Sequence, residues 1–437
     1  MKKASNSNPA AGFGDLPREI LLQILVSLPV ISILRCTAVS KVWNSLIRSS
    51  EFVSHHRSSF TLSSSNPDRR PSLLLRRLTA ASSEHFTLHS DPERFAASSV
   101  AISSPFKPRS GIPGCIHVFG SLHGLICLCD NFHMYAYTIY IWNPSVRRFI
   151  DVPSPTLTFR EMGELAGPNS APAVLGFGYD SNADDYKVVR IAYPRTAGAP
   201  RRAEVYALKE RQWREVPIEV LQSCDGDILW SQCFVDGIIY WPAKVGLRKN
   251  FLLAFDVNDE SFSRIELPKE LPGAGESRLI SISETKVTGL LTVLYYTATS
   301  CEILVKRGCS CADNSWARFC SVSIVDPTRE LVIGLWQDKE VLLQKGSEED
   351  LVGRPRSGQE VVLCSYDHKT RQVELLGMPG AGYLDVFYAA DYTESIVLLE
   401  PEVCAVSYRD PEVEPIARSV NFDLEDAHFK WCAEQRR

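Results

Sequence analysis

Residues 141–153, with the sequence IWNPSVRRFIDVP, have the form of two short strands joined by a polar turn. Trp142 stands before the turn, and a second large apolar residue, Phe149, follows seven positions later. Asn143 before Pro144 suits a type I turn. The flanking β-branched and aromatic residues favour a β-hairpin, and the Trp142 ring is large enough to fill the space between neighbouring sheets.

The same pattern recurs three times, in VYALKERQWREVP (205–217), AFDVNDESFSRIELP (254–268) and SYDHKTRQVELLGMP (365–379). The corresponding pairs are Tyr206 with Trp213, Phe255 with Phe262, and Tyr366 with Val373. Successive copies start roughly 64, 49 and 111 residues apart, so we expect one degenerate copy in the last gap, around Trp316. A strand-built repeat of ~40–50 residues is typical of a β-propeller, in which radially stacked four-stranded sheets cover each other's faces.

The segments around these hairpins extend the all-β pattern. GLICLC (124–129), YTIYIW (137–142) and DYKVVRIAY (185–193) are short, β-branched or aromatic, and bounded by turn residues. We therefore predict a propeller-like domain over 111–415 and a C-terminal tail over 416–437. Residues 58–110 are rich in Ser, Pro and Arg, which indicates a linker with partial docking, and SLLLRRL (72–78) within it has a helix-like pattern.

The N-terminal region has a helical pattern instead. Residues 1–14 are expected to be disordered, and a first helix is predicted over 17–27, with Pro17 in its first turn. Leu28 precedes Pro29, which forces the chain to turn before a second helix over 30–38. Ser40 is a candidate N-cap for a third helix over 41–48, and a short fourth turn is expected at 49–52.

The first helix is apolar on two sides. At 100° per residue, Leu22 and Val26 lie on a different face from one broad arc formed by Ile20, Leu21, Ile24, Leu25 and Leu28. A helical unit below ~40 residues seldom folds alone, and a large exposed apolar patch usually marks a protein interface. The sequence therefore predicts that a partner covers these helices; the alternative is that they dock on the protein's own second domain.

Three N-terminal stretches, LPREILLQILVSLP (16–29), ILRCTAVSKVWNSLI (33–47) and SSEF (49–52), resemble the F-box motif. The matching positions are Leu16-Pro17, Leu28-Pro29, Leu34, Val39-Ser40, Trp43 and Leu46. The resemblance implies an F-box over 15–57 that packs against a Skp-family adaptor and, through it, joins a cullin-RING ubiquitin ligase. The expected adaptor contacts are Leu16, Pro17, Ile20, Leu21, Ile24, Leu25, Leu28, Pro29, Leu34, Val39 and Trp43.

The region from Gly120 to Pro268 resembles the F-box-associated, kelch-like domain of plant F-box proteins. The motifs are GSLHGLICLC, YIWNPSVRRF, GFGYDSNADDYKVV, VYALKERQWREV, CFVDGIIYW and FLLAFDVNDESFSRIELP, and His123 stands where the family more often has Asn. The resemblance implies a small all-α F-box head followed by an all-β, kelch-like propeller of about six blades.

We find no pattern that indicates catalysis or a cofactor. The sequence contains no G-x-S-x-G, H-E-x-x-H or phosphate-binding loop. Cys309, Cys311 and Cys320 lack the paired spacing of a zinc site, and His117, His123 and His133 are too irregularly spaced to converge on one metal. We therefore expect a non-catalytic protein without cofactor or metal.

The amino-acid composition indicates which kinds of partner and which cellular compartment suit the protein. The net charge of -5 and the absence of a long basic run give no sign of nucleic-acid binding. The most apolar stretch, 20–34, is interrupted by Gln23, Ser27 and Pro29 and is shorter than the ~20 apolar residues of a membrane span. Thirteen cysteines and no apolar run after the basic start favour a reducing compartment, cytoplasm or nucleus.

Long polar stretches interrupt the hairpins and are candidate target-binding loops, at 154–172, 194–204, 243–250 and 345–358. The function we infer is substrate recognition within a ubiquitin ligase, with a protein target on the propeller. One alternative is a propeller that binds a glycan or a small molecule and whose helical head only dimerises. A propeller enzyme ranks last, because no acid, base or metal set converges.

Overall fold

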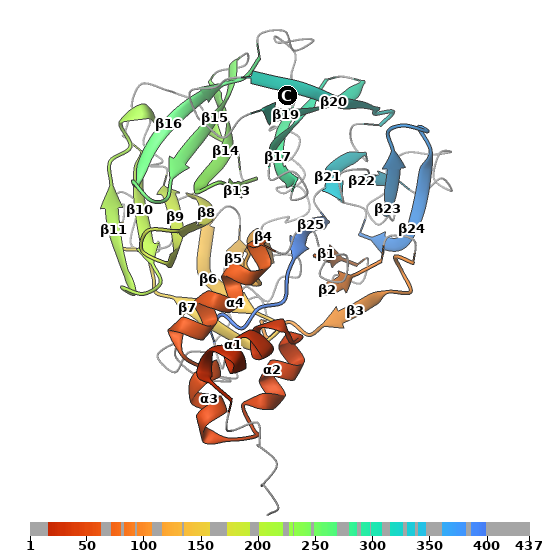
Figure 1. Cartoon of the computed structure of the whole chain (residues 1–437). Coiled ribbons are helices and arrows are strands. Elements are labelled where there is room, and N and C mark those ends of the chain that lie inside the picture. Colours follow the sequence, from red (N-terminus) through yellow and green to blue (C-terminus); the bar gives the residue numbers. More distant parts are fainter. Residues whose placement is uncertain are drawn as a thin grey trace, which may run out of the picture.

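In the residues that it describes, the computed structural model of the chain has four α-helices followed by six β-sheets arranged in a ring (Figure 1). Five sheets have four strands and one has five. The structure describes residues 16–62, 71–79, 83–91, 94–106, 116–132, 135–157, 173–192, 201–221, 227–229, 231–245, 249–268, 279–285, 290–297, 299–307, 315–326, 330–336, 340–346, 361–381 and 386–398. The predicted disordered N-terminus and the predicted C-terminal tail lie outside these ranges.

The helices are α1 (Arg18–Ser27), α2 (Val30–Cys36), α3 (Lys41–Ile47) and α4 (Ser50–Leu62). The Pro17 carbonyl accepts the first hydrogen bonds of α1, and Leu28 is extended before Pro29, as the sequence predicts. The Ser40 hydroxyl accepts a hydrogen bond from the Trp43 N–H at 3.1 Å, which confirms it as the N-cap of α3. The fourth element, expected as a short turn, is a helix of 13 residues.

The six sheets are the blades of a propeller, numbered here from blade 1 to blade 6. Blade 1 contains β4 (Ile116–Leu122), β5 (Leu125–Phe132), β6 (Tyr135–Asn143) and β7 (Arg148–Val152). Blade 2 contains β8 (Ala173–Asp180), β9 (Asp185–Ala192), β10 (Arg202–Ala207) and β11 (Gln212–Val216). After the short 3-10 helix η3 (Glu219–Leu221), blade 3 contains β12 (Asp227–Ile228), β13 (Cys233–Val235), β14 (Ile238–Val245), β15 (Lys249–Asp256) and β16 (Ser261–Glu266).

The remaining blades complete the ring. Blade 4 contains β17 (Leu279–Thr285), β18 (Leu290–Tyr296), β19 (Ser300–Arg307) and β20 (Ser315–Ser323). Blade 5 contains β21 (Leu331–Trp336), β22 (Glu340–Gly346), β23 (Val361–Asp367) and β24 (Val373–Gly380). Blade 6 contains β25 (Phe387–Tyr392), β1 (Ser72–Leu78), β2 (Glu84–His89) and β3 (Ser99–Ile102).

Blade 6 shows that the interpretation of residues 58–110 as a linker is wrong for the strands that they contain. The stretch SLLLRRL is not helix-like but forms β1, which pairs antiparallel with β25, from Ser72 opposite Tyr392 to Arg77 opposite Phe387. β1 supplies Leu73, Leu74 and Leu75 to the core. β25, the last strand in the described residues, thus completes a sheet whose other strands come from the N-terminal part of the chain.

The hairpin pattern of the sequence is confirmed residue by residue. The predicted pairs Trp142 with Phe149, Tyr206 with Trp213, Phe255 with Phe262, and Tyr366 with Val373 are all direct cross-strand partners. Trp316 lies in β20, within the corresponding hairpin of blade 4, where it is opposite Lys306. An aromatic residue outside these pairs also lies between blades: Trp241 of β14 is fully buried, and its indole N–H donates to the Leu175 carbonyl of blade 2 at 2.9 Å.

Most of the predicted long loops cannot be assessed structurally. Residues 158–172, 193–200, 246–248 and 347–360 lie outside the described part of the chain. The prediction for 243–250 is wrong at both ends, because β14 continues to Val245 and β15 begins at Lys249. The predictions for 194–204 and 345–358 are each wrong at one end, because β10 begins at Arg202 and β22 continues to Gly346. Among the described helices, none is both long enough and apolar enough to cross a membrane.

Candidate protein-docking site on the N-terminal helices

Helix α1 has one buried and one exposed apolar face. Leu21, Leu22, Leu25 and Val26 are buried, with exposed fractions from 1% to 8%. Ile20 is 42% exposed and Ile24 is 37% exposed; they are four residues apart and therefore lie above one another on the helix surface. Leu16 precedes Ile20 by a further four residues, outside the helix, and is 37% exposed. An aliphatic strip therefore follows the outer side of α1.

Further exposed apolar residues come from α2, α3 and the chain between them. Ile31 in α2 is 55% exposed, Val39 is 66% exposed and Val42 in α3 is 73% exposed. Of the ten large hydrophobic residues that are exposed in the described ranges, six lie between residues 16 and 42. We call these six the docking set: Leu16, Ile20, Ile24, Ile31, Val39 and Val42. Such a concentration within a few short helices indicates a protein-binding surface.

The structure sorts the eleven predicted adaptor contacts into three groups. The exposed ones are Leu16, Pro17, Ile20, Ile24, Pro29 and Val39. Leu28, Leu34 and Trp43 are half-buried and pack against the core. Leu21 and Leu25 are 7% and 1% exposed because their side chains fill the interior, and their contact with the adaptor stays a prediction.

Sequence reasoning missed two members of the docking set, Ile31 and Val42. Each lies next to a residue that packs inward, Val30 in one case and Trp43 in the other. Neighbouring helical positions differ by about 100°, so a residue adjacent to an inward-facing one can point outward. Helical periodicity could have identified both residues once the inward face was known.

The buried face of the helices belongs to a core that continues into the propeller. Leu21, Leu25 and Phe52 belong to one apolar cluster with Phe119 of β4 and Phe177 of β8, so this cluster extends from the helices into blades 1 and 2. The alternative that these helices dock on the protein's own second domain therefore accounts for this face. It leaves the docking set uncovered.

A polar contact reinforces the junction between helices and propeller. Arg57 of α4 forms an ion pair with Asp184 in the turn between β8 and β9, and its guanidinium lies 4.6 Å from the centre of the Tyr179 ring. The Tyr179 hydroxyl donates a hydrogen bond to the same carboxylate. Burial raises the pKa of Tyr179, as does its hydrogen bond to Asp184, so the phenol stays protonated and remains a donor.

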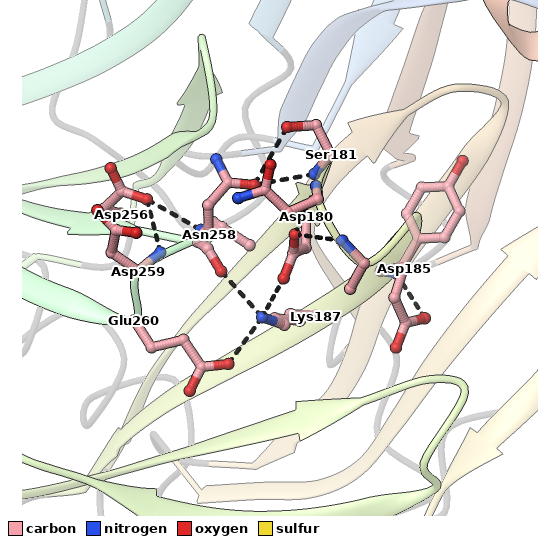
Figure 2. Close-up of polar contacts among 12 residues, drawn as sticks. Asp180, Ser181, Asp185, Lys187, Asp256, Asn258, Asp259 and Glu260 are labelled. Atoms are coloured by element: carbon pink, nitrogen blue, oxygen red, sulfur yellow. Dashed lines mark hydrogen bonds and ion pairs between the residues drawn. The ribbon is translucent and has the colours of Figure 1, made fainter.

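A cluster of buried charges lies between blades 2 and 3 and holds these blades together (Figure 2). The Lys187 ammonium donates to Asp180 at 2.5 Å and to the Val257 carbonyl at 2.9 Å, and it lies 2.7 Å from Glu260. Burial opposes ionisation of Asp180, but hydrogen bonds from Lys187 and from the backbone N–H groups of Ala183 and Asn182 keep its pKa below the ordinary value. Because the Lys187 ammonium has these three acceptors for its three N–H groups, the role of Lys187 is structural.

Nucleophiles and metal ligands do not converge in the described part of the chain. No group of three potential metal ligands occurs there. Burial raises the pKa of the Cys129 and Cys301 thiols, and burial together with Glu302 raises that of Cys320 to about 11, so these thiols are protonated at neutral pH. His123 occupies the turn between β4 and β5, with Nδ1 3.2 Å from the Tyr186 hydroxyl. His133, Cys309 and Cys311 lie outside the described residues.

Comparison with known families agrees with this architecture. Residues 13–57 match the F-box-like family model, and residues 72–283 match the model of the F-box associated beta propeller domain. The chain therefore contains an F-box-like domain followed by an F-box associated β-propeller domain, and the predicted resemblance and fold class are confirmed.

Related proteins come from Arabidopsis thaliana. A protein classed there as an F-box protein is 29% identical over 275 residues, which cover 62% of this chain and 62% of the relative. An F-box/kelch-repeat protein is 26% identical over 260 residues, which cover 59% of this chain and 65% of the relative. The match thus spans less than two thirds of each of these relatives.

Solved structures are more distant. TolB from Acinetobacter baumannii is 9% identical with a TM-score of 0.41, and the alignment covers 73% of this chain and 66% of TolB. A likeness at this level says nothing about function.

Proposed function

We propose that this chain is the substrate-recognition subunit of a cullin-RING ubiquitin ligase. Its F-box helices dock on a Skp-family adaptor, which links it to a cullin, and its propeller binds the protein to be ubiquitinated. One observation carries the proposal: one apolar face of the helices is buried in a core shared with the propeller, yet six large hydrophobic residues of the same small unit stay exposed. A partner that covers the docking set removes this surface from water.

The proposed role is proximity rather than catalysis. A receptor that holds a target protein beside the transfer machinery raises the effective concentration of the target's lysines. The F-box and propeller architecture suits this division of labour, with one part for the machinery and the other for the target. The cytoplasm or the nucleus is the proposed location, in keeping with the thirteen cysteines of the chain.

Titration of a purified plant Skp-family adaptor into the full chain tests this proposal. Ile20→Asp and Ile24→Asp place a carboxylate on the outer side of α1, at residues that are 42% and 37% exposed, so both variants should fold. Burying an unpaired carboxylate in the interface should weaken binding at least thirtyfold, on the order of 2 kcal/mol or more. Calorimetry measures the affinity, and circular dichroism checks the fold.

Leu375→Asp is the matched control. Leu375 is 70% exposed and lies in β24, so the same change in polarity falls on the propeller and should leave adaptor binding unchanged. Absence of binding by the wild-type chain, or equal binding by all variants, contradicts the proposal. Indifference to the adaptor is also what a glycan- or small-molecule-binding propeller outside a ligase would show.

A further inference from the structure

The segment that follows β25 packs against the rest of the molecule. After β25, residues 393–398 form a segment that we call the strap, and Figure 1 shows this blue segment running from the ring toward the helices. Ile396, Val397 and Leu398 are 0%, 4% and 1% exposed. They belong to the apolar cluster that contains both the F-box residues Ile47 and Phe52 and the blade 1 and blade 2 residues. The strap is therefore part of the junction.

Asn143 fixes the strap to blade 1. Its side chain is fully buried, and its amide nitrogen lies 3.1 Å from the Ser395 carbonyl and 2.8 Å from the Val397 carbonyl, to which it donates. The Ser395 hydroxyl oxygen is a third acceptor at 3.1 Å. The Asn143 oxygen faces the other way and accepts the Ser145 N–H at 2.9 Å, which shapes the turn between β6 and β7. The Asn143 side chain thus stabilises the turn through its oxygen and the strap through its nitrogen.

Two neighbouring contacts keep the strap close to the same blade. Arg148 donates to the Leu398 carbonyl at 3.0 Å. Gly124 has a φ of +76°, and a Cβ at this position would lie 2.4 Å from the Ser395 hydroxyl oxygen and 2.7 Å from the Thr393 carbonyl oxygen. Only glycine combines this backbone conformation with so close an approach of the strap.

A second anchor comes from the helices themselves. Arg57 lies on α4 and contacts Asp184 and Tyr179 of blade 2, while the strap is fastened to blade 1. The contacts at two adjacent blades resist rotation of the helices about either one. A single hydrogen-bonded contact at a surface would leave such rotation free.

We propose that the strap, held by Asn143, and Arg57 together form a rigid joint that fixes the F-box helices in one orientation relative to the propeller. Asn143 and Arg57 are positioning residues in this joint. The consequence for presenting a bound target to a ligase rests on the proposed function, because a fixed orientation confines the target to a smaller volume than a flexible tether would. The joint itself requires no partner.

Asn143→Asp is the sharpest test, because it keeps the turn acceptor and removes only the donors to the strap. The new carboxylate faces the Ser395 and Val397 carbonyls, so we expect the strap to detach. Hydrogen exchange of the full chain, followed by mass spectrometry, should then show at least tenfold faster exchange in 393–398 and in α1 and α4. Strands β9 and β10 should exchange within about twofold of wild type.

Asp367→Asn is the matched control. Asp367 occupies the corresponding turn of blade 5, where its carboxylate accepts the Lys369 N–H at 2.8 Å, and the substitution is the reverse of the test. It should leave the strap and helices at wild-type exchange rates. If Asn143→Asp leaves the strap protected, or frees the strap without loosening the helices, the joint is refuted.

Arg57→Met keeps the proposal testable if Asn143→Asp fails to fold. It removes the second anchor without touching the strap, and we expect faster exchange in α4 and a larger radius of gyration by small-angle X-ray scattering. Wild-type exchange in α4 together with an unchanged radius contradicts the joint. Adaptor titration is a separate measurement, so failure of the wild-type chain to bind adaptor would overturn the proposed function and leave these results interpretable.

Discussion

At the scale of single residues, Lys187 shows how this propeller handles buried charge. Two carboxylates from neighbouring blades, Asp180 and Glu260, share one buried ammonium (Figure 2). Such a cluster adds little net stability compared with apolar packing, yet removing one partner leaves uncompensated charge in the interior. Loss of the cation should therefore be far more costly than loss of an ordinary surface ion pair.

Lys187→Met should lower the free energy of unfolding by about 3–5 kcal/mol, measured by urea denaturation. Arg202→Met is the control, because the side chains of Arg202 and its partner Glu215 are 40% and 49% exposed, and such a pair contributes about 0–1 kcal/mol. Equal losses in the two variants would show that the Lys187 cluster is no more important than a surface pair.

The pH dependence of the Lys187→Met variant follows from the same cluster. In the wild type the pKa of Asp180 lies below its unfolded value, so its contribution is present above about pH 4 and is lost as the pH falls. In Lys187→Met, burial without the ammonium should raise the pKa of Asp180. Lowering the pH then protonates Asp180, which removes its uncompensated charge and stabilises the variant. The difference in unfolding free energy between wild type and variant should therefore narrow from pH 7 to pH 4.

At the scale of elements, the outer hairpins share one turn geometry. Arg147, Arg211, Glu260 and Arg371 each follow the repeat's first aromatic residue by five positions, and each has a φ between 52° and 59°. A non-glycine residue in this left-handed conformation costs about 1–2 kcal/mol. The strain recurs in four blades because the turn, not the side chain, requires it.

Arg371→Gly should stabilise the protein by about 0.5–1 kcal/mol, after the added backbone entropy of glycine is subtracted. Lys369→Gly, in the same turn but at a residue without positive φ, should destabilise it by a similar amount. Thermal unfolding of both variants checks the sign. A destabilising Arg371→Gly would mean that the Arg371 side chain contributes more than its backbone strain costs.

The sequence was sufficient to predict the hairpins and insufficient to predict blade 6. A hairpin is local: Trp142 and Phe149 are seven residues apart and meet across one turn, so the pattern alone fixes their register. β1 pairs with β25, more than 300 residues away, and no local signal marks that partner. The run of two arginines in SLLLRRL also obscured the strand, because Arg76 is buried through its ion pair with Glu84 at 3.1 Å.

At the scale of the whole molecule, the F-box helices are apolar on two faces. Leu21, Leu25 and their neighbours belong to a core shared with the propeller and the strap, whereas the docking set is exposed. Periodicity identified the excess of apolar surface correctly. It could not show which face is buried, because Phe119 and Ile396, which share the core with Leu21 and Leu25, are distant in sequence.

Hydrogen exchange of the full chain with and without a purified Skp-family adaptor tests most directly whether the docking set is an interface. We expect slower exchange on adding adaptor in peptides from residues 16–43, with no change in the strands of blades 3 to 5. Unchanged exchange in 16–43 at saturating adaptor, or protection confined to the propeller, would contradict the assignment of this surface to the adaptor.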